Sequence, residues 1–487
     1  MSEIVGSLRR LATRSAIFVV ADFLQLAIGF FLLPLYTSHL GPADYGALSV
    51  ARAVGAILIV LYLQSLESAY VRFYYDLEDE RRRREFFGSL WVVQLGYTAV
   101  ITAGLEIAGR AGLFEHLISV PYDPHLRLVV WTTFLIATAL LLPRALFLAR
   151  EQAWYYAGSN IFLFLLSLAA IVYFVAWRGE GAAGSLRGTF IATACVAVPG
   201  VAYVLYNIRL TVNMQDVKRA LALALPLVPH LLSLWVLSLA DRVILERYVS
   251  LDDVGVYSLG YQIGSVPQLV AFAVATAIDP FYFRVAATRA DARPILSTLA
   301  TYYILIVTCA GIATVALAPE MITLMKARPE YRAALTVIPW VVLGSAVRGF
   351  YFVFLAALTY AKSVRMLPLV TVAAAILNIA LNVILIPRFG YIAAAITTVA
   401  AYVVQAVMLY YFAQRSFPIP YQWRRLAILT LAAGLWGAIL WSIALPNPLV
   451  SLGVKGLLLA FFPAALFLMR FFPAEERLRL AALWVRR

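Results

Sequence analysis

Long apolar segments separated by short polar turns run through the whole chain. Most are about 20 residues or longer, and they lack the alternation of apolar and polar residues that a membrane-spanning strand shows. We therefore expect an all-α polytopic membrane protein with about 14 transmembrane helices. The segments fall at 15–38, 45–70, 86–109, 125–149, 152–177, 187–207, 220–245, 254–282, 295–318, 335–360, 367–386, 391–412, 426–445 and 451–472.

One stretch of the sequence occurs twice. His39–Ile57, HLGPADYGALSVARAVGAI, has a degenerate copy at Tyr248–Val266, YVSLDDVGVYSLGYQIGSV, in which Gly46 aligns with Gly255. Each copy lies between two apolar segments, and an even number of predicted helices separates the copies. The two halves are therefore expected to share one orientation in the membrane, as a parallel repeat of two pseudo-symmetric six-helix bundles.

The repeat also predicts how the chain is divided. Residues 1–219 would form the first six-helix bundle and residues 220–425 the second, while residues 426–487 would add two transmembrane helices and a tail. The loops are too short for an extramembrane domain with a core of its own.

Basic residues are concentrated in the loops on one side of the predicted helices. By the positive-inside rule this side, which includes both termini, is cytoplasmic, and Gly41–Asp44 and Ser250–Asp253 lie outside. The net charge of +14 therefore reflects topology and not nucleic-acid binding. The basic residues on the cytoplasmic side include Arg81–Arg84, Arg144, Arg150, Arg209, Lys218, Arg219, Arg284, Arg289, Arg293, Lys362, Arg365, Arg415, Arg424, Arg425 and Arg486–Arg487.

Composition agrees with a membrane protein and gives little sign of an enzyme. With 63% hydrophobic and 13% charged residues, the chain is too apolar for a soluble protein of this length. Cys195 and Cys309 both lie in apolar segments, so neither a disulfide nor a metal site is predicted. We find no D-x-D, H-E-x-x-H or nucleotide-binding glycine motif, and we predict no catalytic residue and no cofactor.

Arginines within the apolar segments are the strongest indication of a binding site, because a charge at mid-depth in a bilayer costs on the order of 3 kcal/mol on insertion scales. Arg348 lies near the middle of its segment, and Arg52 lies about a third of the way into its own at about 1.5 Å per residue. Guanidinium groups with few carboxylates nearby favour an anionic substrate such as a phosphate. The alternatives are that Arg52 or Arg348 pairs with a structural carboxylate, and that Arg242 and Glu246, with Asp241 alongside, pair at the membrane interface.

Other polar residues also fall within the predicted helices. Asp22 lies about a third of the way into the first segment from the cytoplasmic end, and the repeat places His230 within one residue of its equivalent position. Asp22 is interpreted either as an ion site or as a hydrogen-bonding group in helix packing. Asn378 and Asn382 lie at helical spacing on one face of the eleventh segment.

Four stretches of the sequence resemble a known family. They are LGPADYGALSVARA at Leu40–Ala53, RFYYD at Arg72–Asp76, DRVILERYVSLDDVGVYSLGYQIG at Asp241–Gly264 and PRFGYIAAAI at Pro387–Ile396. With their order along the chain, they are similar to the polysaccharide transporter, or O-antigen flippase, branch of the multidrug/oligosaccharidyl-lipid/polysaccharide flippase superfamily. The resemblance covers essentially the whole chain.

The resemblance implies a flippase that uses alternating access. It would move an undecaprenyl-diphosphate-linked oligosaccharide to the outer leaflet of a bacterial or archaeal cytoplasmic membrane, with a polysaccharide polymerase and a chain-length regulator as further partners. On this view Arg52 and Arg348, with Arg242 or Arg72 in support and with Asn378, bind the substrate. Asp22 or His230 would bind H⁺ or Na⁺ if an ion gradient contributes.

Two alternative functions would each require different features in the sequence. A drug or cation exporter of the same superfamily would be expected to have mainly acidic residues in its cavity. A membrane-embedded polysaccharide polymerase or ligase would need a sizeable catalytic outer loop, and the longest outer loops here, 110–125 and 319–334, are short.

Overall fold

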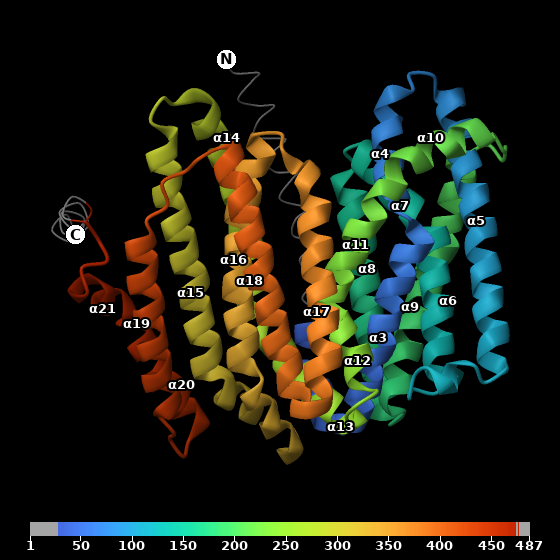
Figure 1. Cartoon of the computed structure of the whole chain (residues 1–487). Coiled ribbons are helices and arrows are strands. Elements are labelled where there is room, and N and C mark those ends of the chain that lie inside the picture. The colour runs from blue at the N-terminus through green and yellow to red at the C-terminus, as the bar shows by residue number, and fades with distance from the viewer. Residues whose placement is uncertain (1–27, 474–475, 477–487) are drawn as a thin grey trace. The chain divides into compact units, whose positions relative to one another are not determined.

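The computed structural model describes residues 28–473 and Glu476, and within these residues it contains helices and no strand (Figure 1). Thirteen helical stretches of the described residues are long and apolar enough to cross a membrane. Their centres coincide with the second to fourteenth segments expected from the sequence, and several extend further at their ends. The prediction of an all-α polytopic membrane protein is confirmed.

The chain divides into two compact units, residues 1–255 and 256–487. The helices of the first unit are α2 (Leu33–His39), α3 (Pro42–Leu63), α4 (Leu66–Asp76), α5 (Glu80–Arg110), α6 (Arg127–Leu135), α7 (Leu141–Ala149), α8 (Ala153–Val172), α9 (Gly181–Asn207), α10 (Met214–Ala224), α11 (Val228–Trp235) and α12 (Asp241–Leu245). Helix α13 (Leu251–Gly264) contains the boundary between the units.

Individual residues explain where some of these helices begin and where one span is interrupted. Pro42 lies in the first turn of α3, where its missing N–H costs nothing. Asp79 caps α5 by accepting hydrogen bonds from the backbone N–H groups of Arg81 and Arg82. Gln64 and Ser65, at φ of 46° and 60°, adopt the left-handed conformation and break the second span into α3 and α4.

The core of the first unit lies where α4, α5, α7 and α10 pack together. Tyr70 and Phe73 from α4 contact Phe86 and Phe87 from α5 in an apolar cluster that also includes Val217 of α10. An ion pair across 2.7 Å also joins Arg82 of α5 to Asp216 of α10. Of the predicted site residues, Arg72 is carried on a helix of this cluster, α4.

Helices α11 and α12, and the end of α10, pack with the first unit although the repeat assigns them to the second half of the chain. They contact α3, α4 and α5, and the Trp235 indole of α11 donates a 2.9 Å hydrogen bond to the Ala53 carbonyl of α3. The compact units therefore divide after Gly255, whereas the sequence repeat divides the chain at residue 219. The repeat-based bundles stay a prediction.

The second unit contains the long helices α14 (Val266–Thr288), α15 (Ala292–Leu324), α16 (Ile338–Tyr360), α17 (Leu367–Phe389) and α18 (Tyr391–Ser416), followed by α19 (Trp423–Ser442), α20 (Pro448–Ala460) and α21 (Phe462–Leu468). Two apolar clusters form its core. One joins α15 to α19 and α21, and the other joins α14, α16 and α18. The C-terminal helices are thus packed on α15.

Candidate functional site

Arg52 of α3 is held by hydroxyl groups from two other helices. Its Nη2 donates hydrogen bonds to the Tyr36 hydroxyl at 2.7 Å and to Ser185 Oγ at 3.3 Å. Tyr36 and Ser185 are themselves hydrogen-bonded at 2.7 Å, and the guanidinium carbon lies 5.1 Å from the centre of the Tyr36 ring. Helices α2, α3 and α9 therefore position this arginine jointly.

The guanidinium group of Arg52 keeps donors available for a ligand. The side chain is exposed, and Nε and Nη1 donate no hydrogen bond to any residue that the structure describes. No carboxylate of a described residue lies within ion-pair distance of Arg52. The fork of donors can therefore bind an oxyanion such as a phosphate.

Arg242 lies near the same cluster. Tyr45 of α3 packs against Tyr36 with the rings tilted by 39° and 5.9 Å between their centres. It interacts electrostatically with both Arg52 and Arg242. The structure thus brings two of the predicted arginines close to one tyrosine. Of the two, Arg242 is buried and carries an ion pair at 2.8 Å to its neighbour Asp241.

The expected pair between Arg242 and Glu246 does not form. Glu246 instead accepts a 3.0 Å hydrogen bond from the backbone N–H of Ser119. Glu246 lies just past the end of α12. Burial raises the pKa of its carboxyl group to about 7, although the hydrogen bond from Ser119 and the charge of Arg247 both act to lower it. Of the two carboxylates that the sequence places beside Arg242, it is Asp241 that forms the ion pair, with 2.8 Å between its Oδ1 and the guanidinium Nη1.

Arg348 of α16 repeats the arrangement of Arg52 in the second unit. Its Nη1 donates a 2.6 Å hydrogen bond to the Tyr402 hydroxyl of α18, and the guanidinium carbon lies 5.0 Å from that ring. Tyr261 and Tyr351 are close enough to interact electrostatically. The Nε atom is buried and has no hydrogen-bond partner among the described residues, so Arg348 also keeps an unused donor.

Arg72 lies apart from these clusters, on α4. It is exposed and forms a 3.5 Å ion pair with Asp76 one turn later. Together with Glu67 and Tyr75 it lines an open cavity of about 510 Å³. Its supporting role in binding stays a prediction.

The remaining predicted site residues are placed as follows. Asn378 is buried between α17 and α18, where its side-chain oxygen accepts a 3.2 Å hydrogen bond from Asn382, which in turn accepts one from Thr397. Its side-chain nitrogen is buried without a partner among the described residues. His230 lies half-buried on α11, and Asp22 lies outside the described residues. Their predicted roles are not decided by these positions.

Asp279, Glu320 and Lys455 are ionisable residues within spans that the sequence interpretation missed. Asp279 lies on α14 in a pocket of the second unit. Glu320 and Lys455 form a buried ion pair at 2.7 Å between α15 and α20. Asp279 and Lys455 are also charged residues within apolar segments, so the criterion that identified Arg348 could have identified them as well. No group of three or more histidine, cysteine or acidic residues in the described part of the chain could hold a metal ion.

Comparisons with known proteins agree with the fold and with the resemblance. The polysaccharide biosynthesis protein family matches residues 11–286, and the MatE family matches residues 226–384. A protein of the Lsg locus of Haemophilus influenzae is 23% identical in a match of 287 residues. The match covers 55% of this chain and 65% of that relative's length.

Solved structures show the same fold at low sequence identity. The lipid II flippase MurJ in an inward closed conformation has a TM-score of 0.75 and 13% identity, over 93% of this chain and all of the other. An inward-facing multidrug resistance transporter of the MATE family has a TM-score of 0.63 and 14% identity, over 86% of this chain and 98% of the other. Both the family and the fold are those of membrane transporters, and the chain belongs to the polysaccharide biosynthesis family of the multidrug/oligosaccharidyl-lipid/polysaccharide flippase superfamily.

Proposed function

We propose that the protein is a flippase for an undecaprenyl-diphosphate-linked oligosaccharide. It moves this lipid from the cytoplasmic to the outer leaflet of a bacterial or archaeal cytoplasmic membrane by alternating access. The glycan is a building block of a surface polysaccharide such as O-antigen, capsule or exopolysaccharide. Family membership and the fold shared with a lipid II flippase support a lipid-linked glycan as the cargo.

The observation that carries the proposal is the matching environment of Arg52 and Arg348. Each guanidinium group is bonded to a tyrosine hydroxyl and lies over that tyrosine's ring. Neither has a carboxylate partner among the residues that the structure describes. A positive charge within a membrane span is energetically costly, and such residues usually have a function. A diphosphate is a ligand that would balance this charge.

The direction of transport follows from the charge of the cargo. A diphosphate carries roughly two negative charges, and each is worth about 2.3 kcal/mol per 100 mV of membrane potential. A potential that is negative inside therefore drives the head group outward by about 4–5 kcal/mol per 100 mV. Under this proposal Asp22 or His230 binds H⁺ or Na⁺ only if an ion gradient adds to that driving force, and a polysaccharide polymerase and a chain-length regulator act on the glycan after release.

The experiment that tests the function uses purified protein in lipid vesicles. A fluorescent polyprenyl-diphosphate oligosaccharide is placed in one leaflet, and its appearance in the other is followed with an impermeant glycosidase. We expect protein-dependent transfer that is faster when the membrane potential favours movement of the anion. The matched control is the same glycan on an uncharged polyprenyl carrier, which should cross slowly. Export of a lipophilic cation without transfer of the diphosphate lipid would instead support the drug exporter.

A further inference from the structure

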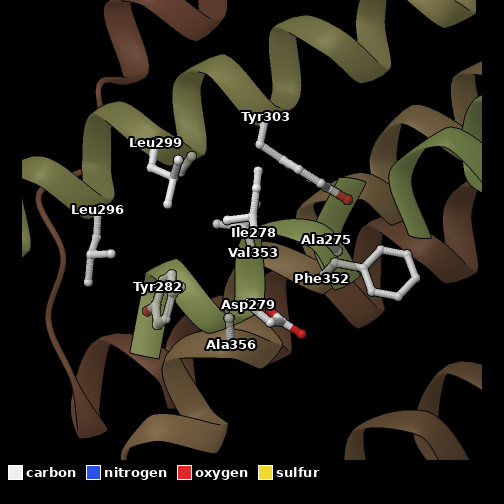
Figure 2. Close-up of a pocket in the computed structure, with 11 residues that line it drawn as sticks. Ala275, Ile278, Asp279, Tyr282, Leu296, Leu299, Tyr303, Phe352, Val353 and Ala356 are labelled. Carbon is white, nitrogen blue, oxygen red and sulfur yellow. The ribbon is translucent and has the colours of Figure 1, made fainter. Parts of the chain in front are cut away.

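A small apolar pocket in the second unit contains one acidic side chain (Figure 2). It lies between α14, α15 and α16, and Asp279 of α14 is the only carboxylate in its lining. The other lining residues are Ala275, Ile278, Tyr282, Leu296, Leu299, Ala300, Tyr303, Phe352, Val353 and Ala356. A volume of about 30 Å³ leaves room for a few water molecules at most.

Asp279 has no ion pair or hydrogen bond with any other residue that the structure describes. The titratable groups that face it are Tyr282 on its own helix and Tyr303 on α15, and both phenols interact with its charge. The residues that α16 contributes to the pocket are not titratable. The Asp279 side chain is half-buried. Because a carboxylate without a partner is costly where its surroundings are apolar, binding a proton lowers that cost.

A second polar group in the pocket is also unsatisfied. The Tyr282 hydroxyl is buried and has no hydrogen-bond partner among the described residues, and the Tyr282 side chain is more than nine-tenths buried. Tyr303 in contrast uses its hydroxyl to donate a 3.0 Å hydrogen bond to the Ala271 carbonyl. The pocket therefore contains a carboxyl group and one buried phenol that are not bonded to the rest of the protein.

These groups suit a proton better than a metal cation. Hard cations bind through about six oxygen ligands, whereas this lining offers one carboxylate and two phenols, one of which is already bonded. Pro280 follows Asp279 directly inside α14, and a proline removes a backbone hydrogen bond and permits a helix to bend. A change of charge at Asp279 thus acts on a helix that is already weakened at that point.

We propose that Asp279 is a proton-binding site, and that its protonation changes the packing of α14 against α15 and α16 during the transport cycle. The proton binds to a carboxylate oxygen and returns to water when the pocket opens. The coupling to transport rests on the proposed function, but proton binding itself does not.

Infrared difference spectroscopy tests proton binding without any substrate. In a Glu246→Gln background, which removes a second carboxyl group, one whose pKa burial raises to about 7, a carboxylic acid C=O band should appear as the pH is lowered. This band should be missing in Asp279→Asn, present in Asp279→Glu and displaced in pH by Tyr282→Phe. A titration that is identical in the native protein and in Asp279→Asn overturns the site.

The vesicle assay then tests coupling. In the native protein an imposed proton gradient should change the rate of lipid transfer, and in Asp279→Asn this dependence should be lost, while Asp279→Glu should keep it. Equal dependence in native protein and Asp279→Asn overturns the coupling. If the native protein transfers no lipid at all, the proposed function fails while the infrared titration still decides the proton site.

Discussion

Gly46 and Gly255, the aligned glycines of the sequence repeat, lie against each other where α3 meets the first turn of α13. A β-carbon on Gly46 would be 2.0 Å from the Leu251 carbonyl oxygen, and one on Gly255 would be 1.9 Å from the Pro42 carbonyl oxygen. Pro42 and Leu251 also occupy equivalent positions in the repeat, so the two contacts are reciprocal. The two copies of the repeat therefore have the same residue, glycine, at the point where they contact each other.

The variant Gly46→Ala should destabilise the protein by about 1–3 kcal/mol, because a backbone carbonyl cannot yield as a side chain would. The matched control is Gly96→Ala on α5, where a β-carbon has no neighbour within 4 Å. Replacing a helical glycine by alanine should there be neutral or stabilising by up to about 1 kcal/mol. The measurement is thermal unfolding of both variants in detergent, and equal unfolding temperatures would contradict the close packing.

The predicted topology can be tested with single cysteines. In a background of Cys195→Ala and Cys309→Ala, Asp44→Cys should react with an impermeant thiol reagent from outside only, and Arg81→Cys from the cytoplasm only. Both positions are exposed in the structure, so neither should fail to react because of burial. Labelling of position 44 from the cytoplasmic side would overturn both the orientation and the parallel repeat.

Glu246 should make stability depend on pH. Because burial raises the pKa of its carboxyl group from 4.5 to about 7, the folded state binds the proton more tightly than the unfolded state does. Its contribution to stability is therefore fully present below about pH 4.5 and is lost as the pH rises through about 7. Glu246→Gln stays neutral, so its unfolding temperature should fall less over this range. An unchanged pH dependence in this variant would show that Glu246 is not responsible.

The buried ion pair of Glu320 and Lys455 should fix α20 to α15. Lys455 Nζ also donates a 2.9 Å hydrogen bond to the Ala316 carbonyl, and Ser451 donates one of 2.6 Å to Glu320. Lys455→Met leaves a buried carboxylate unpaired and should cost about 3–5 kcal/mol. The double variant Lys455→Met/Glu320→Leu should recover most of this loss. If thermal unfolding shows that the double variant is as unstable as the single one, the ion pair with Glu320 is not the way in which Lys455 stabilises the protein.

The positions of the helices could be predicted from the sequence because an apolar run of the right length has few other structures available in a membrane. The break at Gln64 and Ser65 could not, since neither residue is a glycine or a proline. Asp279 was missed because the apolar segment was expected to end at residue 282, which placed this side chain near the interface. In the structure α14 continues to Thr288, and Asp279 lies further from the end of the helix.

The arginines of the site were predictable, but the groups that hold them were not. A charge in an apolar segment can be recognised from the sequence, whereas the tyrosines that bind it are supplied by packing of distant segments. Tyr36 and Ser185 are 149 residues apart, and nothing in the local sequence of either one indicates the contact. The same holds for Tyr402, which is 54 residues from Arg348.

In the proposed function Arg52 and Arg348 bind the diphosphate, and glycan transfer by their variants tests this most directly. Arg348→Ala and Arg52→Ala should lose most transfer, while Arg348→Lys keeps the charge but loses the planar fork and should be impaired only in part. Tyr402→Phe is the matched control for Arg348, because it removes the hydrogen bond that holds the arginine and leaves the aromatic ring.

Transfer of the lipid-linked glycan is measured in vesicles that contain equal amounts of each inserted variant. We predict severe loss in both alanine variants, intermediate transfer in Arg348→Lys, and transfer in Tyr402→Phe above that of Arg348→Ala. Native rates in both Arg52→Ala and Arg348→Ala would contradict the account and leave these arginines with a structural role alone.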